Sequence, residues 1–386
     1  MDAGGRLPGT QRRRKRRRGF HTVVTADFRA VGARATDSAM KSSRHWSAEY
    51  AALETRVLAA LRADLGEGEF DARALDVHAF QKQWNEPYGK FCAQNPEPKT
   101  WREIPAVPQS AFKRFRLSVA PPEEIGKTFR TSGTTGEGFG EHHFVNTRLY
   151  EAAVLAGWQR LNLPREAWPV ILAPRPEEAP HSSLAHMLGA LAGDGFFLLE
   201  KDGSLDIGRF MAAMRTCFHA KRPVALLGTA LAFLNVFERL GSARPQCRAK
   251  SFAMETGGYK GSGRDIPKTE LYAMFGGHLD LAPDRVLNEY GMTELSSQFY
   301  TRGLGGVHES GPWLRALVID PETGRETAVG EAGVLRIFDL ANLGSVLAIE
   351  TQDLAIRRAR GFELLGRDPG ALPRGCSRAA DERMRA

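Results

Sequence analysis

Residues 127–140 read KTFRTSGTTGEGFG, and residues 131–136 at their centre are all small, hydroxylated or glycine. Such a run cannot fill a core and is a poor helix former, because Ser and Thr hydroxyls compete with the backbone for hydrogen bonds. Its glycines let several N–H groups approach a ligand closely while the hydroxyls donate alongside, as binding a polyphosphate requires. An ordinary flexible turn is the alternative, although chance would produce this string only on the order of 10⁻⁴ times in such a chain. The stretch therefore predicts a phosphate-binding loop, and it is not of the GxxxxGK[ST] kind.

The positive charge of the chain is concentrated near its start. The net charge is +8, but residues 1–40 hold ten Lys and Arg against three Asp, whereas the remaining residues hold 43 basic and 42 acidic side chains. Self-repulsion within the basic run 12–18 and the lack of apolar periodicity predict a disordered basic tail over residues 1–44. Such a tail could touch nucleic acid or anionic lipid, or Met40 could be the true start. The nearly neutral remainder counts against nucleic-acid binding outside the tail.

The four cysteines are scattered, without CxxC pairs or the spacing of metal ligands. This pattern argues against a disulfide framework and is typical of a reducing cytoplasm, where we expect the protein. No apolar run reaches the ~18 residues that a membrane span needs. We expect Cys92, Cys217 and Cys247 to be buried or inert, since none has basic neighbours on both sides.

Apolar patterning predicts an α/β protein whose last third is rich in strands. In the middle of the chain, strand-like runs alternate with helical stretches, which indicates parallel sheets flanked by helices. The predicted strands are 169–173, 195–199 and 223–228, and the predicted helices are 149–161, 182–191, 207–220 and 230–240. Upstream, helices over 45–65 and 72–91 carry aromatic residues that we interpret as core. From Trp313 onward, short strand-like runs predict a β-rich subdomain, either a small barrel or a second sheet.

A second segment with nucleotide-binding chemistry is VLNEYGMTE, residues 286–294. Tyr290 supplies a flat ring, Gly291 permits close backbone approach, and Thr293 and Glu294 add a hydroxyl and a carboxylate. A purine, an α-phosphate and Mg²⁺ together require this set of groups. A plain strand end followed by a turn is the alternative for this segment alone.

The segments and their order resemble the adenylate-forming superfamily, which includes acyl-CoA synthetases, phenylacetate-CoA ligases and acyl-protein synthetases. The matching segments are the phosphate loop 131–136, the glycine pair Gly257 and Gly258, the YGxTE segment 290–294, the TxD segment 351–353 and the GRD hinge 366–368. Gln352 replaces the usual glycine of the family's TGD segment. The resemblance covers roughly residues 100–378 and implies the adenylate-forming large-domain fold.

The resemblance also implies ATP-dependent activation of a carboxylic acid, with ATP and Mg²⁺ as cofactors. The residues implied to hold the phosphates are Thr131, Ser132, Gly133, Thr134, Thr135 and Gly136. Gly257 and Gly258 would lie beside adenine, on which Tyr290 would stack. Thr293 would bond the α-phosphate and Glu294 would hold Mg²⁺, while Asp353 would bind the ribose hydroxyls with Arg367 near them. Asp353 is chemically suited, because one carboxylate accepts from two adjacent hydroxyls.

Two departures from the family pattern stand out. The phosphate loop usually continues into a Pro-Lys pair that residues 137–143 lack, so we expect Lys127 or Arg130 to balance the phosphate charge. Only 19 residues follow Arg367, so we expect the large domain without the full C-terminal lid that carries a catalytic lysine in acyl-CoA ligases. The predicted domains are the tail 1–44, the large domain 45–366, and a hinge with a short C-terminal tail over 367–386.

A short adenylating chain of this kind resembles the acyl-protein synthetase branch of the bacterial luciferase fatty-acid reductase. In that branch the acyl group passes to an enzyme cysteine near the C-terminus and then to a reductase partner. Cys376, between Arg374 and Arg378, stands in that region, and the arginines would lower its thiol pKa. The resemblance thus implies a fatty-acid-activating acid–thiol ligase with Thr135, Glu294 and Cys376 as catalytic residues.

Three alternatives stay open from the sequence. Cys376 could be an incidental tail cysteine, and the acyl acceptor could be CoA or a carrier protein. A nucleic-acid-binding protein that acts through its basic tail is the alternative from a different class. The sequence does not identify the acid, whose specificity we expect to be set within residues 173–240.

Overall fold

The computed structural model describes residues 46–131, 138–193, 195–259, 264, 266–367 and 383–384. Most of the predicted phosphate loop, residues 132–136, and the predicted cysteine nucleophile, Cys376, lie outside these ranges. The predicted tail 1–44 also lies outside them, so the domain boundaries stay predictions.

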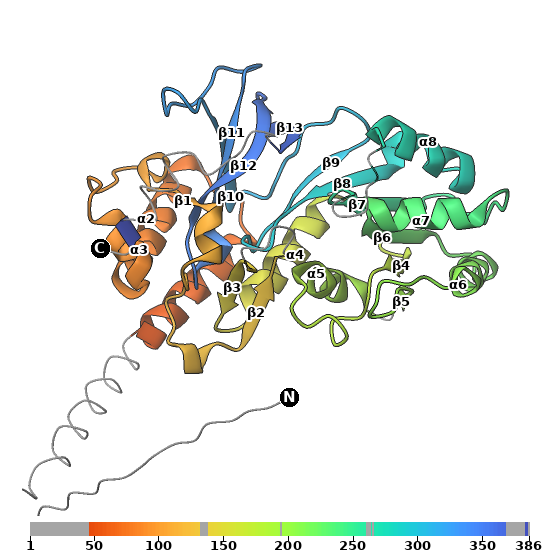
Figure 1. Cartoon of the computed structure of the whole chain (residues 1–386), viewed down its shortest axis with the longest axis horizontal. Helices are drawn as coiled ribbons and strands as arrows, with labels where there is room; N and C mark the ends of the chain where they lie inside the picture. The colour runs from red at the N-terminus through yellow and green to blue at the C-terminus, as the bar shows by residue number, and fades with distance from the viewer. Residues whose placement is uncertain are drawn as a thin grey trace, which may run out of the picture. The chain divides into compact units, whose positions relative to one another are not determined.

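A six-stranded, mostly parallel sheet forms the middle of the described chain (Figure 1). Its strand order is β5 (Phe196–Phe197), β4 (Trp168–Leu172), β6 (Val224–Thr229), β7 (Phe252–Thr256), β8 (Val286–Tyr290) and β9 (Phe299–Arg302). Every neighbouring pair is parallel except β8 with β9. The strands are apolar almost throughout because both faces of a parallel sheet are covered by other elements. The predicted parallel α/β sheet is confirmed.

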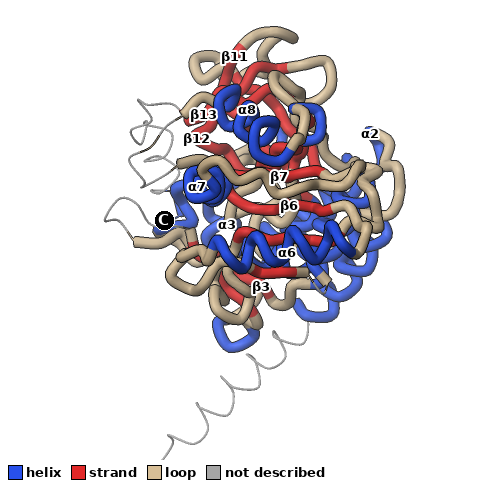
Figure 2. The backbone as a smooth tube through the Cα atoms, turned by 90° about the vertical axis from the view of Figure 1, so that its right-hand side faces the viewer, coloured by secondary structure: helices blue, strands red, loops and turns tan. Residues whose placement is uncertain are grey.

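Alternate residues of these strands enter two different cores. Val170 and Leu172 of β4 pack in a cluster with α6 (Ile207–His219), α7 (Ala230–Leu240) and α8 (Lys268–Leu279). Ile171 and Ala173 pack on the other face with α4 (Arg148–Arg160) and α5 (Ser183–Ala192). The sheet is therefore the middle of three layers, and Figure 2 shows α6 and α7 together on one side of it. Of the five helices, α8 was not predicted from the sequence.

A second sheet is built from the last third of the chain, as the β-rich prediction required. Its order is β1 (Val107–Pro108), β12 (Ala348–Arg357), β11 (Ala332–Asp339) and β10 (Leu314–Ile319), with β13 (Phe362–Arg367) also paired to β12. The structure thus selects the second sheet over the small barrel. Strand β1 was predicted only as an extended approach to the glycine loop. It pairs in parallel with β12 although the paired residues are 242 positions apart, which the local pattern does not reveal.

Helices from the start of the described chain pack against this second sheet. Residues 46–60 are helical and are followed by α2 (Glu67–Trp84) and α3 (Glu86–Cys92). The aromatics of this region belong largely to the core, as predicted: Trp46, Tyr50, Phe80 and Tyr88 are buried. The single helix predicted over 72–91 is wrong in one respect. Asn85 ends α2 and caps α3 by accepting from Tyr88 N at 3.3 Å, and the proline that follows cannot continue the helical hydrogen bonding.

A two-stranded hairpin carries the ends of the predicted phosphate loop. Strands β2 (Lys127–Arg130) and β3 (Glu141–Phe144) are antiparallel, and the loop connects them. The segment before the hairpin is not simply extended, since it forms short 3₁₀ helices. These are η1 (Trp101–Glu103), η2 (Gln109–Lys113) and η3 (Pro122–Glu124); η4 (Pro283–Arg285) and η5 (Leu340–Asn342) occur later in the chain.

Candidate active site

The carboxyl ends of the parallel strands form one edge, at which two of the predicted segments begin. Thr229, Thr256 and Glu289 are in register across β6, β7 and β8, so Gly257 and Tyr290 each occupy the position at or just beyond the same edge. Gly257 has φ of +67°, a conformation that glycine adopts without strain. Gly257, Gly258 and Gly291 are all exposed, which leaves their backbone open to a ligand. Ligands of open α/β sheets bind at such an edge.

Tyr290 and Asp353 meet at this edge, although they come from different sheets. The Tyr290 hydroxyl donates to Asp353 Oδ2 at 2.7 Å. The Tyr290 ring is buried and contacts Phe362 at 5.6 Å between ring centroids. Burial and the Asp353 charge raise the pKa of Tyr290, so its hydroxyl stays protonated and acts as the donor. The residues predicted for adenine and for ribose are therefore direct neighbours.

Arg367 joins the same group through strand pairing. Asp353 and Arg367 are partners in the β12–β13 register, and Arg367 Nε lies 3.5 Å from Asp353 Oδ1. The TxD segment lies inside β12 rather than in a turn, so the sheet holds Asp353 in place. Gly366 and Arg367 of the hinge segment therefore lie next to the TxD segment. The third hinge residue, Asp368, lies outside the described residues.

The foot of the predicted phosphate loop is closed by two hydrogen bonds. Thr131 N donates to Gly140 O at 2.9 Å, and Gly140 N donates to Thr131 Oγ1 at 2.8 Å. The Thr131 hydroxyl therefore serves the hairpin itself. The next five predicted phosphate ligands, Ser132, Gly133, Thr134, Thr135 and Gly136, lie outside the described residues, and their role stays a prediction.

The hairpin is bound directly to the YGxTE segment. His142 of β3 has Nδ1 at 2.9 Å from Thr293 O, and Ser183 Oγ lies 3.4 Å from Thr293 Oγ1. Burial lowers the pKa of His142 to about 3, so this imidazole is neutral and its Nδ1 carries the proton given to the carbonyl. The structure thus brings the loop hairpin, Thr293 and the start of α5 to one place.

Glu294 is buried and held at both its side chain and its backbone. Gln109 Nε2 donates to Glu294 Oε1 at 3.0 Å, and Asn342 Nδ2 donates to Glu294 O at 2.9 Å. Mg²⁺ is commonly bound by one or two carboxylates with phosphates and waters as its other ligands. A carboxylate next to Thr293, whose backbone contacts the loop hairpin, fits that kind of site. In the part of the chain that the structure describes, no cluster of three or more His, Cys, Asp or Glu could hold a metal without such help.

Asp339 fixes the segment that follows Glu294. It is fully buried and accepts from Ser296 N at 2.9 Å, Ser297 Oγ at 2.8 Å and Ala341 N at 2.9 Å. Burial raises its pKa to about 6. Gln109, Asn342 and Asp339 were not found from the sequence, because nothing in their local pattern signals contacts with residues 40 to 190 positions away.

A buried polar network lies beside Tyr290. Glu255 accepts from Asn288 Nδ2 at 2.8 Å, and Asn288 Oδ1 lies 2.8 Å from His308 Nε2. The His308 ring stacks on Phe362 at 5.3 Å with an interplanar angle of 11°. Burial lowers the pKa of His308 to about 4, so its imidazole is uncharged at neutral pH, and burial raises the pKa of Glu255. The network fixes strand β8 immediately before the Tyr290 ring.

The glycine of the YGxTE segment has a structural reason to be glycine. A Cβ atom on Gly291 would collide with the Glu289 carboxylate, which is buried and accepts a hydrogen bond from the Thr256 hydroxyl. Burial raises the pKa of Glu289 to about 7. Position 291 therefore has two reasons to be glycine: close packing against Glu289, and the close backbone approach to a ligand inferred from the sequence.

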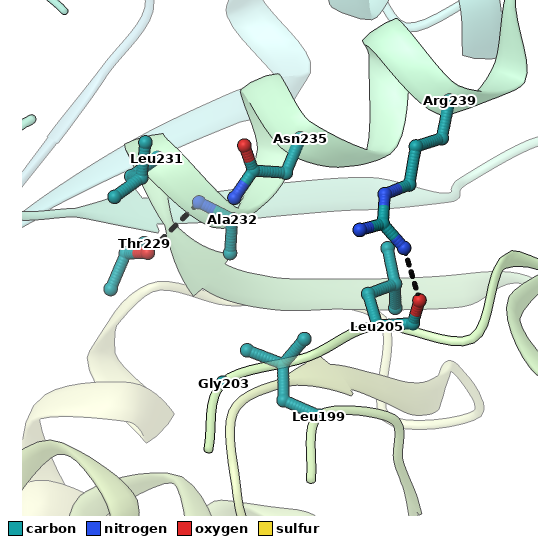
Figure 3. Close-up of a pocket in the computed structure, with 8 residues that line it drawn as sticks. All are labelled: Leu199, Gly203, Leu205, Thr229, Leu231, Ala232, Asn235 and Arg239. Carbon is teal, nitrogen blue, oxygen red and sulfur yellow. Dashed lines mark hydrogen bonds between the residues drawn. The ribbon is translucent and has the colours of Figure 1, made fainter. Parts of the chain in front are cut away.

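A cavity of about 200 Å³ opens near the end of β6, within the region 173–240 where we expect specificity. Thr229, Asn235 and Arg239 provide polar groups, and the rest of the lining is mostly apolar (Figure 3). Arg239 donates to Leu205 O, which ties α7 to the segment opposite. Thr229 also caps α7 by accepting from Ala232 N at 3.0 Å.

The remaining cysteines and histidines behave as ordinary structural residues. Cys92 and Cys217 are buried, and burial raises the pKa of Cys92 and of the partly buried Cys247 to about 12. Burial of Cys92 and Cys217 and the raised pKa of all three thiols agree with the prediction that they are buried or inert. His186 Nε2 lies 3.0 Å from Glu151 Oε1, and His181 Nδ1 lies 3.0 Å from Thr128 O.

No protein-family model matches this chain, and no curated protein matches it. Among solved structures, it is similar to 2-hydroxyisobutyryl-CoA ligase in complex with 2-HIB-AMP and CoA, with a TM-score of 0.56 and 15% identity over 79% of this chain and 71% of that chain. The chain has the large-domain fold of the adenylate-forming enzymes. This confirms the predicted fold class, and at such identity the likeness concerns the fold alone.

Two further structures match a smaller share of the adenylate-forming fold. ATP-bound MatB from Rhodopseudomonas palustris has a TM-score of 0.46 and 17% identity over 64% of this chain and 49% of that chain. McyG A-PCP complexed with phenylalanyl-adenylate has a TM-score of 0.46 and 14% identity over 66% of this chain and 49% of that chain. The chain spans about half the length of these two proteins. Among its described helices, none has the length and apolarity to cross a membrane.

Proposed function

We propose that this protein is an acid-activating ligase, which converts a carboxylic acid and ATP to an acyl-adenylate and then passes the acyl group to a thiol. The observation that carries the proposal is the hydrogen bond between Tyr290 and Asp353 at the edge where the loop hairpin also meets Thr293. These contacts support the proposal, because they bring together segments that are far apart in the sequence and whose side chains suit a base, a ribose and a phosphate.

The first step forms the mixed anhydride. A carboxylate oxygen of the acid attacks the α-phosphorus of ATP, the bond from that phosphorus to the bridging oxygen breaks, and pyrophosphate leaves. Thr293 binds the α-phosphate, and the hydroxyls and N–H groups of residues 131–136 hold the departing phosphates. Bound at Glu294, Mg²⁺ would supply positive charge to the phosphate oxygens. The rest of the catalysis is positioning and electrostatic stabilisation.

The nucleoside is held by the edge residues. Tyr290 stacks on adenine beside Gly257 and Gly258, and the Asp353 carboxylate accepts from the ribose hydroxyls with Arg367 beside it. The bond from Tyr290 to Asp353 occupies one lone pair of the carboxylate, whose two oxygens offer about four. Ribose and Tyr290 can therefore share Asp353.

The second step moves the acyl group to sulfur. A thiolate attacks the acyl carbonyl and the carbon–oxygen bond to AMP breaks, so that AMP leaves with its phosphate. We place this thiolate at Cys376 and the acid among fatty acids, in line with the acyl-protein synthetase branch, with a reductase or carrier as the final acceptor. CoA is the second candidate, because a ligase with this fold is found in complex with 2-HIB-AMP and CoA.

The first experiment is acid-dependent exchange between ATP and labelled pyrophosphate, measured over short, aromatic and long-chain acids. We expect exchange that requires Mg²⁺ and is highest with a fatty acid. Exchange with another acid class would keep the adenylation and overturn the fatty-acid assignment. No exchange with any acid would contradict the proposed function.

The second experiment identifies the thiol. Cys376→Ser is expected to retain pyrophosphate exchange and to lose covalent labelling by a radioactive acid, whereas Cys247→Ser is expected to retain both. Labelled enzyme in the Cys376→Ser variant would end this assignment. AMP release that depends on added CoA would favour the second candidate.

A further inference from the structure

Glu294, the carboxylate proposed for Mg²⁺, is bonded to a side chain from a distant part of the sequence. Gln109, the first residue of η2, donates from its Nε2 to Glu294 Oε1 at 3.0 Å. Glu294 is buried, and a hydrogen bond shielded from water in this way is electrostatically stronger than an exposed one. Any role of this pair toward Mg²⁺ rests on the proposed function.

The chemistry of the two groups fixes which way the Gln109 amide faces. An ionised carboxylate only accepts hydrogen bonds, so the amide must present its NH₂ group to Glu294 rather than its oxygen. The amide oxygen, Gln109 Oε1, is buried and has no hydrogen-bond partner among the described residues. Mg²⁺ keeps several of its water molecules when it binds a protein, and such waters need acceptors. An unpartnered amide oxygen in the group that is bonded to the carboxylate therefore fits a hydrated Mg²⁺ ion.

The position of Gln109 is set by the second sheet. The two residues before it form β1, in which Pro108 pairs with Glu350 of β12, and the proline ring restricts the backbone to a φ of −59°. Strand β12 also carries Asp353, so one strand fixes both the start of η2 and the residue proposed for ribose. Phe112, three residues after Gln109, is buried and anchors the rest of the short helix.

The backbone around Glu294 is fixed independently of Gln109. Asn342 Nδ2 donates to Glu294 O at 2.9 Å, and Ser296 N donates to the buried Asp339 at 2.9 Å. These bonds set where the Glu294 side chain begins, but they do not set its torsion angles. The bond from Gln109 is made to the carboxylate itself, so it acts on the orientation of the oxygens that would bind a metal.

We propose that Gln109 is the positioning residue for the metal-binding carboxylate. It holds Glu294 in one orientation, in which Glu294 Oε1 accepts from the amide while the carboxylate keeps further lone pairs for Mg²⁺. The Gln109 amide oxygen accepts from a water molecule of the bound ion. Gln109 thus acts through Glu294 and the metal, and not on the nucleotide.

The test measures ATP binding to the full chain by calorimetry, at increasing Mg²⁺ concentration and in EDTA. Gln109→Met keeps the length of the side chain and removes both its donor and its acceptor. We expect half of the Mg²⁺-dependent gain in ATP affinity to need about 10- to 100-fold more Mg²⁺, with the affinity in EDTA within about twofold of native. Gln159→Met, at an exposed position of α4, is the matched control and should change neither quantity.

A double-mutant cycle separates positioning of the carboxylate from support of the fold. If Gln109 acts through Glu294, Gln109→Met should raise the Mg²⁺ requirement of the native protein and add no further change in a Glu294→Gln background. A weaker ATP affinity in EDTA, or an equal further loss in the Glu294→Gln background, would show a structural role and overturn the proposal.

The remaining outcomes distinguish this proposal from the proposed function. Unchanged Mg²⁺ dependence in Gln109→Met would overturn the positioning role, while Mg²⁺-dependent ATP binding by the native protein would uphold the nucleotide site. If Gln109→Met does not fold, as judged by circular dichroism, Gln109→Ala provides the same comparison. Failure of the native protein to bind ATP at any Mg²⁺ concentration would overturn the proposed function together with the role of Gln109.

Discussion

At the scale of single residues, the account depends on pairs of side chains that are distant in the sequence and adjacent in space. Tyr290 and Asp353 are 63 residues apart and share a hydrogen bond of 2.7 Å. The tyrosine proposed to stack on the base thus also donates to the carboxylate proposed to bind the sugar. The ribose contact and the position of the ring are therefore coupled.

Asp353→Ala should weaken ATP binding about 10-fold or more, because the ribose hydroxyls lose a charged acceptor. The effect should vanish with 2′,3′-dideoxy-ATP, which has no hydroxyls to offer. The measurement is the affinity of native and variant protein for both nucleotides. An equal loss with the dideoxy nucleotide would show that Asp353 acts only by holding Tyr290.

Glu289 predicts a pH dependence of stability. Its pKa is about 7 in the folded protein and about 4.5 when unfolded, so between these pH values only the folded state keeps the proton. The free energy of unfolding should therefore fall as pH rises from 4.5 to 7, by about 3 kcal/mol from this group. Asp339 contributes in the same direction at lower pH, so the comparison with Glu289→Gln isolates Glu289.

Denaturant unfolding at pH 5 and pH 8 provides the check on Glu289. The free energy of unfolding of Glu289→Gln minus that of the native protein should be larger at pH 8 than at pH 5, because only the native protein loses the stabilising proton. A constant difference between native protein and variant over this range would contradict the raised pKa.

At the scale of secondary-structure elements, the hairpin β2–β3 and the helix η2 act together. The hairpin positions the ends of the phosphate-binding segment, and η2 lies against it with Lys113 at one end and Gln109 at the other. Neither element is long, so contacts between them, rather than their own hydrogen bonding, set their geometry.

Gly140→Ala tests the closure at the foot of the hairpin. The added Cβ would lie 3.2 Å from Thr131 Cγ2, so Thr131 must shift by a few tenths of an ångström, whereas the 3.6 Å to Lys113 Cγ is an ordinary van der Waals contact. We expect a loss of stability of about 1 kcal/mol and a several-fold loss of ATP affinity. Gly277→Ala in α8 has open space around its Cβ and is the control, with no loss of ATP affinity expected. Unchanged ATP affinity in Gly140→Ala would contradict a role of the hairpin foot in positioning the phosphate-binding segment.

The elements that the sequence predicts well are those with a continuous pattern. Strands such as Val224–Thr229 and helices such as Ala230–Leu240 follow from apolar runs and 3.6-residue periodicity, because both elements bury whole faces. Helix η2 and strand β1 were missed, since a few residues around Pro108 carry no periodicity. The contact of Gln109 with Glu294 therefore could not be predicted from the sequence.

At the scale of the whole described chain, residues from both sheets and from the leading helices converge on Glu294. Gln81 of α2 is fully buried and donates to Asn342 O at 2.9 Å and Leu343 O at 3.2 Å, while its Oε1 accepts from Leu347 N at 2.8 Å. Asn342 in turn donates to Glu294 O at 2.9 Å. The leading helices thus support the segment that holds the predicted metal ligand.

Gln81→Ala should lower the free energy of unfolding by about 2–4 kcal/mol, because it leaves buried backbone groups without partners. It should also raise the Mg²⁺ concentration needed for half-maximal pyrophosphate exchange. Gln83→Ala, at an exposed position of the same helix, is the control and should change neither quantity. A destabilised Gln81→Ala protein with unchanged Mg²⁺ dependence would show that α2 supports the fold but not the site.

The sequence predicts the fold and the residues of the nucleoside site, but not the contacts that arise only from tertiary packing. The order of the segments predicted the fold, and the contact of Tyr290 with Asp353 agrees with the nucleoside site inferred from that order. The counter-charge for the phosphates stays a prediction, since the sequence suggests Lys127 or Arg130 and Arg130 donates to Glu141 at 2.9 Å. The acid also stays undetermined, since the lining of the cavity near Thr229 is made of residues that resemble any core.

Whether the acid attacks the α-phosphorus of ATP is decided by where the oxygen of the acid appears among the products. The acid that best supports pyrophosphate exchange is labelled with ¹⁸O in its carboxylate and incubated with ATP, Mg²⁺ and the thiol acceptor, and the products are analysed by mass spectrometry. If the carboxylate attacks the α-phosphorus, AMP will carry one ¹⁸O and pyrophosphate none. Label in pyrophosphate or in inorganic phosphate, or ATP cleavage with no label in AMP, would contradict the account.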